Sequence, residues 1–420
     1  MSTTVPENDQ VFAAEPVPES TGPEVKEETL QEQTEPKSGK KKKEKKPFKV
    51  ALRERGFLKP GFLVCLSLFV FSVLLYVACR FLPDLAEFWT RYPSQGIRLV
   101  LAKMTGWIPF SLMEFLIYAL PVVIIAFFIF SGRSLKKKDT TENFHKWLNP
   151  LICTLLVIAS LFCTAFGPCY FRRSLSENLS LVDAKVSGEQ LDRTARAVAA
   201  ELEAVLPEVR FLSDGASVQP YGYDKLVEKI NDAYERFAND PDHAFLSTFR
   251  SNPKRLFCSP VFTYTHISGV YTFVTGEANI NTNYPDFVRP FTIAHEMAHQ
   301  RGVAKEEEAN FVAYLVCLSS DDPYVRYSAC TTMLQYLGDA LYKADKDRYQ
   351  EVYGSVLPVQ YSGEMKAYSL FFNAYRDSTA SKVTKAVNDT YLSSQGEKAG
   401  TASYGLVVDL AVAYYESLPD

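Results

Sequence analysis

The chain has 420 residues, of which 47% are hydrophobic and 22% are charged, and its formal net charge is -4. These values are typical of a globular protein with ample material for a core, and they exclude a chain that is disordered throughout. The averages nevertheless combine three different regions: a polar tail, an apolar segment and a mixed remainder.

Residues 1–56 contain no sustained apolar periodicity. They are acidic as far as Glu35 and then change to a basic run between Lys40 and Lys46. Such a segment cannot bury enough apolar surface to offset the entropy lost on ordering, so we predict a disordered tail. No apolar stretch precedes Phe57 and no small-residue cleavage site follows one there, so we expect no cleavable signal peptide.

Residues 57–169 contain three stretches of membrane-spanning length. Each approaches the roughly 20 apolar residues that a helix needs to cross a bilayer. A buried helical hairpin is the alternative, but three such stretches close together, with Arg and Lys at their flanks, favour a membrane region. We predict transmembrane helices at about 61–82, 108–130 and 148–166.

The positive charges predict how these helices are oriented. Lys and Arg are concentrated before the first span and between the second and third, whereas the loop Pro83–Trp107 mixes acidic and basic residues. By the positive-inside rule, the N-terminus is cytoplasmic and residues 170–420 form an extracytoplasmic domain of the cell membrane protein. Glu114 in the second span is a functional candidate, because carboxylates are costly inside a membrane, although it lies near the outer end and can reach interfacial water.

Residues 170–420 are expected to form one mostly helical domain. The segments 188–206 and 223–237 have the apolar spacing of amphipathic helices. Between residues 260 and 281, strand-forming residues alternate with Gly-containing breaks, which predicts a short β-ribbon. The four cysteines after the spans could form disulfides, but their spacing is not that of a zinc site.

An H-E-x-x-H sequence begins at His295 and ends at His299, in a predicted helix that ends near Gly302. Residues four apart lie on one face of a helix, so both imidazoles can reach one metal ion. Glu296 lies beside them and would accept a proton from a water on the metal, as a general base. A structural pair is the alternative, but the chain has only five histidines and the neighbours of these two are apolar.

A catalytic zinc site needs a third protein ligand and leaves the fourth place for water. Glu306 lies in the next predicted helix, at about 305–319, and shares a face with Asn310, which could orient a ligand histidine. Glu308 competes for the ligand position. Acidic residues also suit a helix N-terminus for electrostatic reasons alone, so that alternative stays open.

The stretches 275–281, 295–302 and 306–310 together resemble the uncharacterised membrane family labelled domain of unknown function 3810, which is regarded as zinc-peptidase-like. The similarity covers the chain from the first span to the C-terminus and leaves out the basic tail. It implies a mainly α protein: a three-helix membrane region followed by a mostly helical, zincin-like (gluzincin-type) domain with a small β-ribbon. It implies no substrate.

The form Glu-x-x-Ala-Asn at residues 306–310 is also similar to an element of prenyl-protein peptidases and repressor-cleaving metallopeptidases, in which the first Glu binds zinc. This similarity favours Glu306, although Glu306 follows His299 more closely than in most such enzymes, which leaves Glu308 open. In zinc peptidases of this kind an edge strand pairs with the substrate backbone, and residues 274–281 are the candidate. The alternative is that Asn279 and Asn281 are turn residues.

The leading hypothesis is a membrane-anchored zinc endopeptidase with Zn²⁺ bound by His295, His299 and Glu306. Its partners would be the lipid bilayer and a protein or peptide substrate, and we expect no nucleic acid. The alternative is a non-catalytic membrane protein with a structural zinc site, whose outer domain binds a partner or a cell-wall component. Candidates for stabilising the transition state are the side chains of His266, Tyr314 and Tyr404.

Overall fold

The computed structural model describes residue 50 and residues 56–135, 140–182, 185–376, 378–395 and 404–418. The expected disordered tail therefore lies almost wholly outside the described residues. The described part is mainly helical and carries two small sheets.

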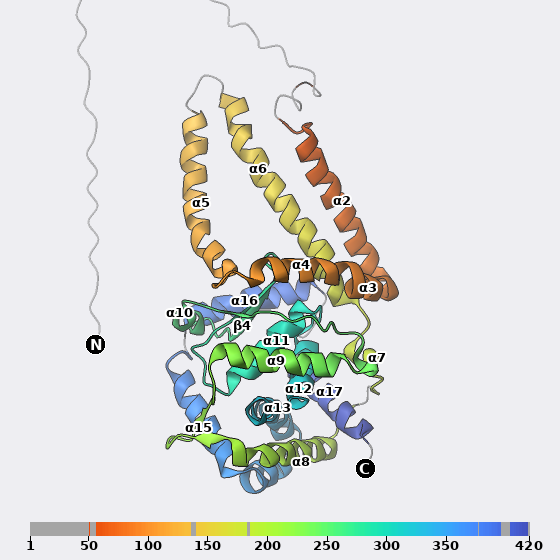
Figure 1. Ribbon diagram of the computed structural model, residues 1–420, viewed down its shortest axis with the longest axis vertical. Coiled ribbons are helices and arrows are strands. Elements are labelled where there is room, and N and C mark those ends of the chain that lie inside the picture. The colour runs from red at the N-terminus through yellow and green to blue at the C-terminus, as the bar shows by residue number, and fades with distance from the viewer. Residues whose placement is uncertain are drawn as a thin grey trace, which may run out of the picture. The chain divides into compact units, whose positions relative to one another are not determined.

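In the described part of the chain, three helices are long and apolar enough to cross a membrane, as predicted (Figure 1). They are α2 (Pro60–Phe81), α5 (Leu112–Leu135) and α6 (Thr140–Leu161), and α6 packs against both of the others. A π-helical turn, η2 (Phe162–Phe166), continues α6. The second span begins four residues later than expected, because the Ser111 side chain accepts a hydrogen bond from the Glu114 backbone and caps the helix there.

The connection between the first two spans is not the expected loop. It consists of α3 (Pro83–Trp89), a π-helical turn η1 (Thr90–Ser94) and α4 (Gln95–Gly106), and α4 lies across the near ends of the long helices (Figure 1). Ser94, Arg98, Ala102 and Thr105 recur at helical intervals and are all buried. The charged residues of this segment suggested a loop, whereas the spacing of its buried residues is that of a helix.

The remaining helices form a body with one large apolar core. Pairs that pack together include α8 with α13, α11 with α12, and α12 with α13. The predicted helices at 188–206 and 223–237 are confirmed as α8 and α9, and all eight cysteines, each within the described residues, are unpaired. The helices of the body are α7 (Leu175–Asn178), α8 (Gly188–Val205), α9 (Tyr223–Ala238), α10 (Ser259–Thr263), α11 (Val288–Gln300), α12 (Glu306–Leu318), α13 (Pro323–Ala344), α14 (Lys346–Glu351), α15 (Val359–Asn373), α16 (Thr379–Ser394) and α17 (Tyr404–Ser417), with short turns η3 (Gly167–Phe171), η4 (Leu206–Glu208), η5 (Pro241–His243) and η6 (Val352–Val356).

The predicted β-ribbon is confirmed in its second half only. Strands β4 (Gly269–Thr272) and β5 (Glu277–Ile280) pair antiparallel, with Gly269 opposite Ile280. A third strand, β3 (Lys254–Arg255), pairs parallel with β5, so the sheet order is β3-β5-β4. The expected strand residues near Val261 instead form α10, where Pro260 occupies the first turn of a helix. A separate two-stranded sheet joins β1 (Arg210–Phe211) to β2 (Ser217–Val218).

Candidate metal centre

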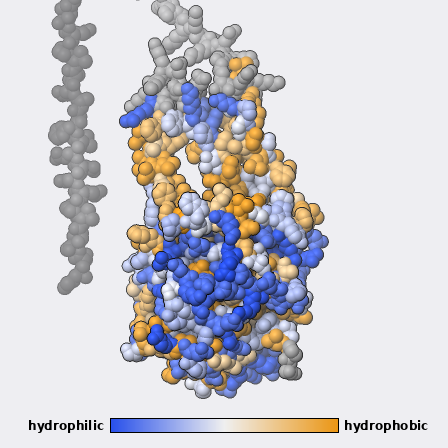
Figure 2. All heavy atoms as spheres, viewed as in Figure 1, coloured by the Kyte–Doolittle hydropathy of each residue, from blue (hydrophilic) through white to orange (hydrophobic). Residues whose placement is uncertain are grey.

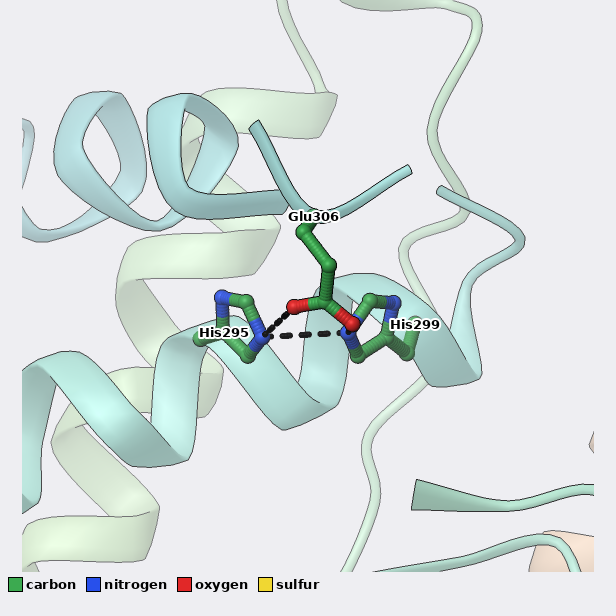
Figure 3. Close-up of side chains that lie close together, drawn as sticks. All are labelled: His295, His299 and Glu306. Atoms are coloured by element: carbon green, nitrogen blue, oxygen red, sulfur yellow. Dashed lines mark hydrogen bonds and ion pairs between the residues drawn. The ribbon is translucent and has the colours of Figure 1, made fainter. Parts of the chain in front are cut away.

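Helix α11 brings the two histidines of the H-E-x-x-H sequence together. His295 Nε2 and His299 Nε2 lie 3.0 Å apart, and the two rings are almost perpendicular. His299 is buried and His295 is half-buried. Both nitrogens that could bind an ion therefore point to one place on the helix face (Figure 3).

Glu306, the first residue of α12, completes the cluster (Figure 3). Its Oε2 lies 3.3 Å from His295 Nε2, and its Oε1 lies 3.7 Å from His299 Nε2. A tight turn returns the chain from α11 to α12, and Gly302 supplies the left-handed backbone conformation (φ 88°) that the turn requires. His295, His299 and Glu306 together could hold a metal ion.

The donor atoms fit a zinc ion. With tetrahedral geometry and ligand bonds of about 2.1 Å, ligand atoms lie about 3.4 Å from one another. The two Nε2 atoms lie 3.0 Å from each other, and each lies 3.3 or 3.7 Å from one of the two carboxylate oxygens of Glu306. Two imidazole nitrogens and one carboxylate are also a donor set of catalytic zinc sites, which leave one place open.

The remaining ring nitrogens show how the histidines are oriented. His299 Nδ1 lies 2.7 Å from the Val303 carbonyl oxygen, so Nδ1 donates there, and once Nε2 has lost its proton its lone pair would be available to an ion. His295 Nδ1 is buried and has no hydrogen-bond partner. Among the described residues, Asn310 bonds to neither imidazole, so the Val303 carbonyl takes the orienting role that we expected of Asn310.

Glu308 points away from the histidines. Its Oε1 accepts a hydrogen bond of 3.0 Å from the Leu175 backbone and lies 3.2 Å from Lys305 Nζ. The carboxylate therefore fixes the start of α7 against α12. Of the two glutamates that the sequence left open, only Glu306 lies in the cluster.

Glu296 is buried beside the cluster with one carboxylate oxygen free. The Tyr271 backbone on β4 hydrogen-bonds to the carboxylate, while Oε2 has no partner. Gly269 closes the other side, since a Cβ there would lie 2.6 Å from Glu296 Oε1. Burial raises the pKa of Glu296, although the charges of His295 and His299 act in the opposite direction.

Glu306 and His299 perturb each other's ionisation strongly. Burial lowers the pKa of His299, but the charge of Glu306 outweighs this effect and raises the pKa to about 9. Burial raises the pKa of Glu306, yet the charge of His299 and hydrogen bonds from both histidines hold that pKa well below its usual range. Glu306 is therefore ionised at neutral pH, as a metal ligand must be.

Residues 90–412 match the model of a family described as Protein of unknown function (DUF3810). The chain belongs to this family. The matched range begins at Thr90, after α2, and ends at Val412, so it is shorter at both ends than the range expected from the sequence. No curated protein matches the chain, and no solved structure does.

Helix α4 of this family member supports α11 from the side of the membrane-length helices. Arg98 is fully buried and donates to the carbonyls of Gln300 (3.1 Å) and Arg301 (3.3 Å), at the C-terminal end of α11. A cation suits this position because the last carbonyls of a helix are unpaired and carry partial negative charge. In the sequence, Arg98 is one of several charged residues in an expected loop, and no pattern there indicates this contact with α11.

Aromatic side chains form a wall beside the histidines. Phe166, at the end of the third membrane-length helix, contacts the His299 ring at a centroid distance of 6.3 Å. Tyr271 and Tyr170 pack on Phe166, and the Tyr391 hydroxyl on α16 lies 3.2 Å from the Tyr170 hydroxyl. The cluster of His295, His299 and Glu306 therefore adjoins the end of a membrane-length helix, which no local sequence pattern indicated.

Two of the three expected candidates for transition-state stabilisation have hydrogen-bond partners outside the cluster. His266 Nε2 bonds to the Tyr375 carbonyl (2.8 Å), and Tyr314 is fully buried against the Tyr415 hydroxyl (2.5 Å). The side chain of Tyr404 lies outside the described residues. Tyr391 is a better candidate, because its hydroxyl accepts from Tyr170 in the aromatic wall beside His299 and so keeps its own proton to donate. Burial and, to a smaller extent, the charge of Glu306 raise the pKa of Tyr391 to about 12.

The predicted substrate strand is wrong in its position. Residues 274–281 contain β5, which has β3 on one side and β4 on the other and is therefore the central strand of the sheet. The Asn279 amide bonds to the Val270 carbonyl and to the Ser111 hydroxyl, which makes it part of the sheet rather than a turn residue. The edge strands are β3 and β4, and the backbone of β4 contacts Glu296.

Glu114, a functional candidate in the sequence, forms hydrogen bonds that hold two parts of the structure together. Its carboxylate accepts hydrogen bonds from the backbones of Phe257 (2.6 Å) and Cys258 (2.8 Å), at the start of α10. In return, Glu277 of β5 accepts from the backbones of Leu112 and Met113 at the start of α5. The two carboxylates join the second membrane-length helix to the sheet of the body.

Proposed function

We propose that the protein is a membrane-anchored, zinc-dependent endopeptidase. The observation that carries this proposal is the position of Glu296, a buried carboxylate with a free oxygen, beside a three-residue cluster that could hold a metal ion. A site that only joined two helices would need no such group. His295, His299 and Glu306 would be the metal ligands.

Each group has a separate role in the proposed reaction. Zinc held there would supply Lewis-acid chemistry, which lowers the pKa of a water molecule and polarises a carbonyl. Glu296 would take a proton from the attacking water and pass it to the leaving amine. Tyr391 would donate a hydrogen bond to the oxygen that becomes negatively charged in the transition state.

The edge strand supports a peptide as the substrate. Extended chains bind sheet edges through their backbone groups, and β4 is the edge strand whose backbone also bonds to Glu296. A peptide paired with β4 would place its backbone along the metal cluster. We further propose that the body lies outside the cytoplasm, as the distribution of Lys and Arg predicts.

The test measures metal content and hydrolysis on the full chain in lipid nanodiscs. We expect one zinc per chain in the wild type and in Glu296→Gln, and a large loss in His295→Ala. The wild type should cleave a mixture of internally quenched peptides, and Glu296→Gln should lose this activity while it keeps zinc and fold, because the amide is nearly isosteric but cannot accept the proton.

The same variants separate the enzyme from the alternative, a structural zinc site. If zinc only joins α11 and α12, His295→Ala will unfold the body while Glu296→Gln behaves as the wild type in every assay. For cellular substrates, protein N-termini are profiled in membranes from cells that carry either the wild type or Glu296→Gln. Identical profiles, with equal protein levels, would contradict the proposal.

A further inference from the structure

The segment from α3 to α4 has an apolar face turned outward. Phe88, Tyr92, Val100, Met104 and Trp107 are all exposed, and Trp107 is 79% exposed. Phe88 and Tyr92, and likewise Val100 and Met104, are four residues apart, so each pair lies on one side of the helical segment. The π-helical turn η1 between the two pairs lowers the rotation per residue and so reduces the angle between them. We name these five residues the apolar stripe.

The opposite side of the segment is polar and buried. Ser94 and Arg98 lie two residues from members of the stripe, which places them on the far side of the helix. Arg98 bonds to the end of α11, and Gly276 of the sheet packs against Leu101 and Ala102 of α4. The segment therefore cannot turn its stripe inward without exposing Arg98 and breaking the support of the metal helix.

A helix with charge inside and apolar residues outside does not suit an aqueous surface. Amphipathic helices at a membrane surface have this arrangement, with the apolar side in the lipid. Tyr and Trp are also enriched at the boundary between membrane and water. The stripe contains one of each.

The position of the segment points to lipid as the occupant. It directly joins two membrane-length helices, α2 and α5, and lies across their near ends (Figure 1). In Figure 2, the hydrophobic surface of the long helices gives way to a mainly hydrophilic surface over the body. The stripe thus continues the apolar surface of the spans at the level where they end.

The body contributes a second apolar surface at the base of α5. Phe257 is 90% exposed and Val261 on α10 is also exposed. Glu114 lies in the first turn of α5 and accepts a hydrogen bond from the backbone of Phe257. This bond places Phe257 next to the end of the second membrane-length helix. Two elements from distant parts of the chain therefore present apolar side chains beside the same ends of the spans.

We infer that the apolar stripe, together with Phe257 and Val261, lies in the head-group region of the bilayer, with lipid as its partner. This contact holds the body against the membrane surface. Because Arg98 connects the stripe helix to α11 and Phe166 contacts His299, the metal centre then lies next to that surface. The inference does not depend on the proposed peptidase activity.

The test uses Trp107 in the full chain, reconstituted into phosphatidylcholine vesicles. The difference in emission between the wild type and Trp107→Phe reports on this residue while Trp89 and Trp147 stay in place. We expect strong quenching by lipids brominated near the head-group end of the acyl chain, weaker quenching by lipids brominated at the chain terminus, and little quenching by acrylamide. Met104→Trp in the Trp107→Phe background should repeat this result one turn along the stripe.

Val359→Trp is the matched control. Val359 is an exposed apolar residue on α15 of the body, so its reporter should be quenched by acrylamide and not by brominated lipid. Quenching of Trp107 by acrylamide to the same extent as this control would overturn the inference. So would protection from acrylamide without quenching by brominated lipid, because a protein partner or a second copy of the chain would then cover the stripe.

Discussion

Gly269 leaves no room for a side chain beside Glu296, and Gly269→Ala tests the arrangement of the site. A methyl group there would lie 2.6 Å from Glu296 Oε1 and 2.7 Å from Thr292 Cγ2. Unstrained contacts need about 3.5 Å, so the carboxylate or β4 must move by about 0.9 Å. Gly269 has no positive φ, so the effect of alanine is steric and not a strained backbone.

The displacement should appear in turnover rather than in metal content. A shift of about 1 Å in a catalytic group costs on the order of 100-fold in rate, so we expect kcat/KM of the proposed peptidase to fall about 100-fold in Gly269→Ala. Overpacking should lower the free energy of unfolding by about 1–3 kcal/mol. Zinc content should stay at the wild-type level, since no ligand lies against Gly269.

Quenched-peptide hydrolysis by nanodisc-embedded protein, with zinc measured on the same sample, provides the assay. Gly354→Ala is the control, because Gly354 is exposed and no atom lies within 4 Å of a Cβ placed there. The control should match the wild type in turnover. If Gly269→Ala also matches it, the view that β4 positions Glu296 is refuted.

Three further predictions follow from the site and its support. Glu306→Ala should lose zinc and Glu308→Ala should retain it, as measured by metal analysis; the reverse result would reassign the ligand. Arg98→Met should lower the free energy of unfolding by about 3–5 kcal/mol, because four backbone carbonyls lose their charged donor; a denaturation midpoint equal to that of the wild type would contradict this support. Protease added to intact cells should degrade the body, and degradation only after permeabilisation would reverse the proposed orientation.

Features that depend on short stretches of sequence could be predicted well. A membrane-length helix needs only an apolar window, and all three windows are helical. The spacing of His295 and His299 needs only the helical period, and the two nitrogens do converge. The family membership, predicted from a few short stretches, is confirmed over residues 90–412.

The choice between Glu306 and Glu308 shows where local information ends. Residues two apart on a helix point about 200° away from each other, so only one of them can face the histidines. Which one does so depends on the turn at Gly302 and on the packing of α12 against α11. The sequence alone could not decide between them, whereas the tertiary structure places Glu306 in the cluster and Glu308 against α7.

The surroundings of the site depend on contacts between distant parts of the chain. Arg98 reaches Gln300 across 202 positions of sequence, and its role is visible only when α4 and α11 lie together. Strand β5 is central and not an edge strand, because β3, a strand of two residues with no alternating pattern, pairs with it. By itself the sequence determined the membrane-length helices and the spacing of the histidines, because local hydropathy and the helical period control these features. The tertiary structure decided which residues surround the histidines, because burial and strand order are properties of the whole fold.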